Sequence, residues 1–131
     1  MRRGVVALGL ALVLVGGLLF LRQALPGLGR IDPAQGASIY QRNCSVCHGT
    51  QAEGKDPAPP LNPTGHAHHH PDWDLYTIIA DGRVGLGEMP AWKDKLSVHE
   101  IRTIIAYIKT LWTDDQHRFQ QEVNRNQPAP P

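Results

Sequence analysis

Residues 44–48 read Cys44-Ser45-Val46-Cys47-His48, and these two cysteines are the only ones among the 131 residues of the chain. They stand too close together for a disulfide between them to hold a domain together. A zinc site would require two further ligands at metal-site spacing, and a thioredoxin-like redox pair would require a βαβ context. The sequence offers neither, so this pentapeptide indicates covalent attachment of a c-type haem.

The chemistry of haem attachment explains the spacing within this haem motif. The thiols of Cys44 and Cys47 add to the two vinyl groups on one edge of the porphyrin, and His48 turns its imidazole under the iron. Three points of attachment therefore hold the haem. We predict one covalently bound haem c per chain, anchored by Cys44 and Cys47, with His48 as the first axial ligand.

The second axial ligand is predicted by elimination. Apart from Met1, Met89 is the only methionine of the chain. It lies in Gly85-Leu86-Gly87-Glu88-Met89-Pro90, a glycine-rich stretch without a helix face that a core methionine would fill. A thioether ligand raises the haem potential relative to a second imidazole. Met89 is therefore predicted to complete the iron coordination.

The residues before the haem motif predict a helix over 33–43. Asp32 is placed to cap its N-terminus, and Pro33 stands at the first helical position, where its missing N–H costs nothing. Gly36 and Tyr40 are four residues apart and share one face. A partner helix can therefore approach closely over the glycine while the tyrosine ring packs beside it.

The residues after the haem motif predict a loop and two further helices. Residues 49–63 hold two Gly and four Pro and predict an ordered loop. A second helix is predicted over 72–80, with Asp72 as its cap and Gly82 after its end. Ser97-Val98-His99-Glu100 is a capping box, and the apolar stripe behind it comprises Ile101, Ile104, Ile105, Ile108, Leu111 and Trp112. No stretch shows the alternation of a strand, so the fold class is all-α.

Over residues 33–113 the chain resembles a class I, mitochondrial-type monohaem cytochrome c domain. The matching residues are Gly36 and Tyr40, the haem motif, Pro59-Pro60-Leu61, Met89-Pro90, and the last helix with Tyr107 and Trp112. The resemblance implies three to four helices wrapped around one covalently bound haem, with the first and last helices crossing beside it. It also implies that the carbonyl of Pro59 or Pro60 accepts the ring N–H of His48. Residues 62–71 and the tail after Thr113 depart from the family pattern.

Three further features near the haem are candidates for the site. Arg83 suits pairing with a haem propionate, and Trp92 suits packing on the haem face, although an exposed arginine and a core tryptophan are equally open alternatives. The run formed by His66, His68, His69 and His70 could bind Cu²⁺ or Zn²⁺ as a secondary metal site. We favour a solvated loop with one or two of these histidines near the haem edge or capping the second helix. Axial ligation by one of them in place of Met89 is a third alternative.

The N-terminal segment predicts export and membrane attachment. Gly4 to Leu21 is 18 residues without a charge, which makes a helix of about 27 Å. This core is longer than that of a signal peptide, so we expect residues 1–24 to remain as a single-pass signal anchor, with cleavage near residues 27–29 as the alternative. Residues 25–32 are then a linker, 33–113 the cytochrome c domain and 114–131 a polar, partly disordered extension with a helix near 115–124. The resemblance implies that the haem domain lies on the outer, periplasmic side of a bacterial plasma membrane.

Composition narrows the function further. From Arg30 onward ten basic and twelve acidic residues leave a net charge of −2, and nothing indicates binding to nucleic acid. The whole chain holds eight aromatic residues, a small number for a protein-only core that a buried haem would supplement.

The predicted function is one-electron transfer in a respiratory or periplasmic chain, without enzymatic activity, because two protein ligands leave no free position on the iron. A quinol-oxidising complex or a terminal oxidase is the expected partner. The alternatives are an open-site haem enzyme or gas sensor, and a copper-handling accessory cytochrome that uses the histidine run 66–70.

Overall fold

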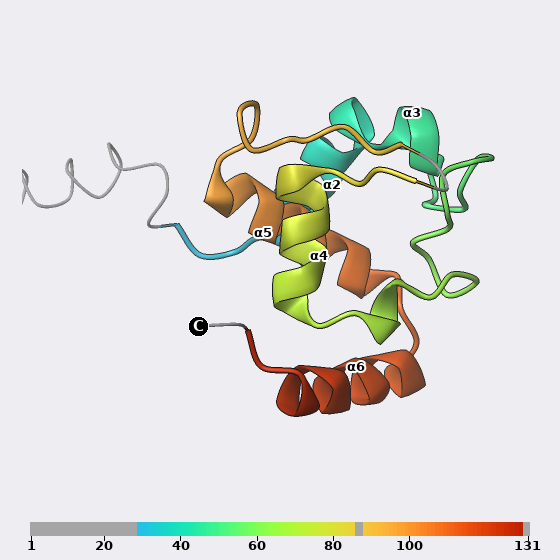
Figure 1. Cartoon of the computed structure of the whole chain (residues 1–131), viewed down its shortest axis with the longest axis vertical. Coiled ribbons are helices and arrows are strands. Elements are labelled where there is room, and N and C mark those ends of the chain that lie inside the picture. The colour runs from blue at the N-terminus through green and yellow to red at the C-terminus, as the bar shows by residue number, and fades with distance from the viewer. Residues whose placement is uncertain (1–28, 86–87, 130–131) are drawn as a thin grey trace, which may run out of the picture. The chain divides into compact units, whose positions relative to one another are not determined.

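The computed structural model describes residues 29–85 and 88–129. From Ile31 onward they belong to one compact unit. Its elements are α2 (Pro33–Asn43), α3 (Ser45–His48), the short 3₁₀ turn η1 (Ala67–His69), α4 (Asp72–Asp81), α5 (Val98–Thr110) and α6 (Asp114–Asn126) (Figure 1).

The all-α prediction is confirmed for the residues that the structure describes. Their only β-type pairings are two isolated bridges, Lys55 with Ala58 and Arg83 with Met89. The predicted anchor, residues 4–21, lies outside the described residues. Among the helices of the described part, none combines the length and the apolar character needed to cross a bilayer.

α2 forms over the predicted range and packs on α5. Asp32 Oδ1 accepts a hydrogen bond from the Ala34 N–H at 2.9 Å, as the predicted N-cap. A Cβ added to Gly36 would lie 2.8 Å from the carbonyl carbon of Thr103 and closer still to its oxygen, so only glycine allows this approach. Beside it, Tyr40 is fully buried and its ring centroid lies 5.2 Å from that of Tyr107. The first and last predicted helices therefore meet as expected.

The predicted cap of α4 is wrong. The N-cap residue is Pro71, and Asp72 is the first residue of the helix. The Asp72 carboxylate instead accepts hydrogen bonds from Lys109 Nζ at 2.5 Å and from Gln120 Nε2 at 2.6 Å. The Asp72 side chain therefore pairs with residues of α5 and α6 and does not cap α4.

α5 begins with the predicted capping box. Ser97 Oγ accepts from the Glu100 N–H at 3.2 Å, and Glu100 Oε2 accepts from the Ser97 N–H at 2.8 Å. The predicted stripe faces the core, since Ile101, Ile104, Ile105, Ile108 and Trp112 are all buried and Leu111 is partly buried.

The C-terminal extension is more regular than predicted. Thr113 and Gln116 form a second capping box, and α6 then runs to Asn126 with Gln120 and Val123 buried. α6 packs beside η1 (Figure 1). The two parts that depart from the class I pattern, residues 62–71 and the tail, therefore pack on each other.

Candidate haem site

Both thiols of the haem motif are available for attachment. Cys44 is partly buried against the core and Cys47 is exposed, and the two are not joined by a disulfide. Burial, reinforced by the neighbouring Cys47, raises the pKa of Cys44 to about 11, so this group is a neutral thiol at physiological pH. The fully buried Tyr40 supports the turn, because its hydroxyl donates to the Gly49 carbonyl at 2.9 Å.

The ring of His48 is held in the orientation that an iron ligand requires. His48 is buried, and its Nδ1 lies 2.9 Å from the carbonyl oxygen of Pro59. Because a carbonyl only accepts hydrogen bonds, Nδ1 carries the proton and Nε2 presents its lone pair. Pro60 packs against Gly65, where an added Cβ would collide with the Pro60 carbonyl. Of the two prolines considered, the structure thus brings Pro59 to His48.

Met89 is held by its backbone within an irregular segment. Its N–H donates to the Arg83 carbonyl at 2.9 Å, and its own carbonyl accepts from the Arg83 N–H at 2.9 Å. The Met89 side chain is partly buried and packs against the core. A soft thioether on a fixed, non-helical backbone has the chemistry of an axial ligand. These residues, with two free thiols and a correctly protonated imidazole, fit a covalently bound haem.

The two other candidates beside Met89 have different surroundings. The Arg83 side chain is exposed, and the structure shows its backbone bridge to Met89. Trp92 is partly buried against the core, and its backbone N–H is shared between the carbonyls of Ile79 and Ala80. Contact of Arg83 and Trp92 with the haem stays a prediction.

The histidine run is not a simple solvated loop. η1 buries Ala67 and places the His68 ring centroid 6.1 Å from that of Trp112 and 5.9 Å from that of Phe119. His69 packs on Phe119 of α6 as well, with ring centroids 4.9 Å apart. His68 and His69 therefore contact Trp112 and α6, while His66 and His69 remain exposed.

The remaining members of the run also have neighbours of their own. His70 Nδ1 lies 2.7 Å from Asp74 Oδ2, so one histidine lies beside the start of α4, but the N-cap is Pro71 and no histidine caps the helix. Across the described ranges 29–85 and 88–129, no group of three or more His, Cys, Asp or Glu side chains is arranged to hold a metal ion. The rings also contact one another, with centroid distances of 4.4 Å between His68 and His69 and 5.9 Å between His66 and His70. Metal binding by His66, His68, His69 and His70 stays a prediction.

His68 predicts a pH dependence of stability. Its Nδ1 is buried without a hydrogen-bond partner among the described residues. Burial, followed by the neighbouring His69 and His66, lowers the pKa of His68 below its ordinary value of 6.5. The pKa of His68 is therefore lower in the folded than in the unfolded chain, and the unfolded chain takes up a proton first as the pH falls. The contribution of neutral His68 to the free energy of unfolding is complete above pH 6.5 and is lost as the pH falls through the folded pKa.

We therefore expect the free energy of unfolding to decrease as the pH falls below 6.5. A His68→Leu variant is expected to lose that part of the decrease, which denaturant titrations at a series of pH values measure. An equal slope in the variant and the wild type would assign the pH dependence to other groups.

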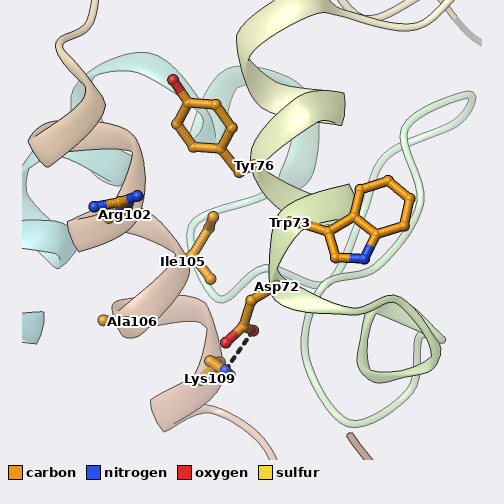
Figure 2. Close-up of a pocket in the computed structure, with 7 residues that line it drawn as sticks. All are labelled: Asp72, Trp73, Tyr76, Arg102, Ile105, Ala106 and Lys109. Carbon is orange, nitrogen blue, oxygen red and sulfur yellow. Dashed lines mark hydrogen bonds and ion pairs between the residues drawn. The ribbon is translucent and has the colours of Figure 1, made fainter. Parts of the chain in front are cut away.

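A pocket of about 400 Å³ lies between α4 and α5. Figure 2 shows Tyr76 of α4 near Ile105 of α5, Trp73 directed away from Ile105, and the ion pair between Asp72 and Lys109 at one end. None of the predicted haem-site residues lines this pocket. It is a groove of the α4–α5 packing and not the haem site.

Comparison with known proteins decides the family. Residues 32–108, more than half of the chain, match the family model described as cytochrome c oxidase, cbb3-type, subunit III. The chain belongs to this cytochrome c family. The cytochrome is 34% identical over 89 residues to the cbb3-type cytochrome c oxidase subunit FixP of Bradyrhizobium sp. (strain ORS 278), and this match covers 66% of the chain and 30% of FixP. It is 32% identical over 74 residues to cytochrome c6 of Bryopsis maxima, covering 56% of the chain and 84% of that protein.

A solved structure agrees with this assignment. Cytochrome cL from the methylotrophic bacterium Methylophaga aminisulfidivorans MPT aligns with a TM-score of 0.58 and 25% identity, over 75% of this cytochrome and 66% of that chain. The class I fold, the covalently bound haem c and the electron-transfer role of the family are thereby confirmed. The cytochrome spans less than a third of the FixP subunit that it matches.

Local sequence patterns do not reveal two hydrogen-bond donors to the loop that carries Pro59. Trp112 Nε1 donates to the Leu61 carbonyl at 3.0 Å, and Gln116 Nε2 donates to the Pro63 carbonyl at 2.9 Å. Thr113 and Gln116 stand at capping-box spacing, which was the available signal that a helix begins here. No local pattern identifies the carbonyls to which the two side chains reach.

Proposed function

We propose that this cytochrome is a one-electron carrier whose haem is anchored by Cys44 and Cys47 and whose iron is ligated by His48 and Met89. The observation that supports the proposal is the hydrogen bond between His48 Nδ1 and the Pro59 carbonyl. It leaves Nε2 free, next to two thiols that form no disulfide. When bound, the haem supplies an iron centre that accepts and releases one electron. Because protein side chains fill both axial positions, we propose no enzymatic activity.

The surrounding residues have opposing effects on the potential. The hydrogen bond to Pro59 increases the basicity of the His48 imidazole, which favours the oxidised state. The Met89 thioether favours the reduced state relative to a second imidazole. The potential of the carrier is then set by the balance of these two ligands.

The same proposal includes a surface for electron exchange. Val46, within the haem motif, is 74% exposed, and Val84, next to the Arg83–Met89 bridge, is 90% exposed. Exposed apolar side chains at both ligand-bearing segments suit a transient contact with a redox protein. We propose a membrane redox complex as the partner, such as a terminal oxidase or a quinol-oxidising complex, reached from an anchor at residues 4–21. The oxidase subunit among the relatives and the apolar N-terminal segment support this choice.

The test is the behaviour of the full, haem-loaded chain toward an electron donor and toward carbon monoxide. We expect rapid, reversible one-electron reduction followed optically, and no spectral change when carbon monoxide is added to the reduced protein. Ready binding of carbon monoxide by the wild type would show an open or easily vacated iron position and would replace the carrier by a haem enzyme or a gas sensor.

A further inference from the structure

The loop that carries Pro59 is tied to the last two helices. In the Pro59–Pro63 loop, the Leu61 carbonyl accepts from Trp112 Nε1 at 3.0 Å and the Pro63 carbonyl accepts from Gln116 Nε2 at 2.9 Å. Trp112 follows the end of α5 and is buried. Gln116 lies in the first turn of α6, where its Oε1 accepts from the Thr113 N–H at 3.1 Å. Each donor is therefore itself held in place.

The loop depends on these ties because proline has no N–H to donate. Before Pro59, the chain is held by the reciprocal backbone bridge between Lys55 and Ala58. After it, the Leu61 N–H donates to the Ala52 carbonyl at 2.8 Å. Asn62 also donates to the Ala52 carbonyl, from its N–H at 3.1 Å, and to the Gln51 carbonyl, from Nδ2 at 3.2 Å. The carbonyls of Leu61 and Pro63 have their partners in the side chains of Trp112 and Gln116. Loss of either donor leaves that side of the loop freer to move.

We propose that Trp112 and Gln116 are positioning residues that set the hydrogen bond between His48 and Pro59, and through it the reduction potential of the haem. This inference rests on the proposed function. A firm hydrogen bond from Nδ1–H to the Pro59 carbonyl makes the imidazole a stronger electron-pair donor to iron, which stabilises the oxidised state. When the loop moves away, the imidazole becomes a weaker electron-pair donor to iron, the reduced state becomes relatively more stable, and the reduction potential rises. Through Gln116, the tail beyond the class I pattern thereby acts on the axial ligand.

Two variants delete the donors with little other change. Trp112→Phe keeps an aromatic ring and removes Nε1–H. Gln116→Glu keeps an acceptor for the Thr113 N–H, since glutamate serves at this capping-box position, and removes the donor to Pro63. Gln121→Glu makes the same charge change at an exposed position of α6. Gln120→Ala removes a buried contact of α6 with His70 and Asp72 while leaving the loop donors in place.

The first measurement is solvent exchange of the His48 Nδ1 proton, followed by NMR in the reduced, diamagnetic protein. We expect exchange about fivefold faster in Trp112→Phe and in Gln116→Glu, as for the weakening of one hydrogen bond. Gln121→Glu and Gln120→Ala are expected to match the wild type.

The second measurement is the midpoint potential of Trp112→Phe, which carries no change of charge. We expect the equilibrium constant for reduction to rise about threefold, or about 28 mV at 59 mV per tenfold for one electron.

The proposal is overturned if exchange in both donor variants and the potential of Trp112→Phe equal those of the wild type. It is equally overturned if Gln120→Ala accelerates exchange as much as they do, because general loosening of α6 would then explain the effect. Failure of the carrier function itself is separate, since it would appear as carbon monoxide binding by the unaltered protein.

Discussion

The reduced Met89→Ala protein is expected to bind carbon monoxide, whereas the wild type is expected not to bind it. Removal of the thioether opens one axial position of the proposed His48–Met89 pair. The midpoint potential is expected to fall by on the order of 100 mV, a modest part of the roughly 0.8 V over which axial ligands move haem potentials. Optical spectra of the reduced protein with and without carbon monoxide, together with voltammetry, measure both effects.

Two further variants separate ligand loss from damage to the segment. Val84→Ala, at a 90% exposed position next to the Arg83–Met89 bridge, is expected to leave the coordination unchanged. Met89→His restores a sixth ligand and is expected to exclude carbon monoxide while keeping a lower potential than the wild type, because imidazole replaces thioether. If Met89→Ala instead retains the wild-type spectrum and potential, another residue is the ligand, and the histidines at 66–70 become the next candidates.

Gly36→Ala is expected to cost about 3 kcal/mol of the free energy of unfolding, a loss typical of overpacking at a rigid contact. The new Cβ would lie 2.8 Å from the Thr103 carbonyl carbon and 2.9 Å from Tyr107 Cβ. The first of these is backbone, which cannot rotate aside. Alanine favours a helix over glycine by about 1 kcal/mol, so a net loss can come only from the contact with α5. Denaturant unfolding of the haem-loaded protein measures the change, and the melting temperature is expected to fall by roughly 12 °C or more.

Gln35→Ala provides the matched control. Gln35 is exposed and neighbours Gly36 in the same helix, so its replacement is expected to change stability by about 0.5 kcal/mol or less. Equal stabilities for Gly36→Ala and Gln35→Ala would mean that α2 and α5 can separate freely, and that the glycine is not required for their packing.

Local patterns predicted the helices well where caps and periodicity agreed. Asp32 and Pro33 begin α2, and the Ser97–Glu100 capping box begins α5, as expected. Asp72 is the instructive failure. It has the residue type of an N-cap, yet its carboxylate pairs with Lys109 and Gln120, which local sequence does not reveal as neighbours. Capping is worth about 1 kcal/mol, so a long-range charge-assisted network can displace it.

The contacts of the histidine run, like those of Asp72, could not be predicted from local sequence. Its composition indicated metal binding or a solvated loop. In the structure, Trp112 and Phe119 surround His68, and Asp74 engages His70. The rings also contact one another, and η1 packs beside α6. The sequence alone does not show where α6 packs.

The sequence by itself determined the haem chemistry and the helices that frame it. Covalent haem attachment depends on cysteines within one turn of chain, and helix ends depend on contacts three or four residues away, so both can be predicted from local spacing. Only the tertiary structure decided which proline carbonyl holds His48, how closely Gly36 meets Thr103, and which loop Trp112 and Gln116 restrain. These contacts join segments 11 to 67 residues apart. Their partners are chosen by the packing of the whole domain, because no local energy term distinguishes one distant carbonyl from another.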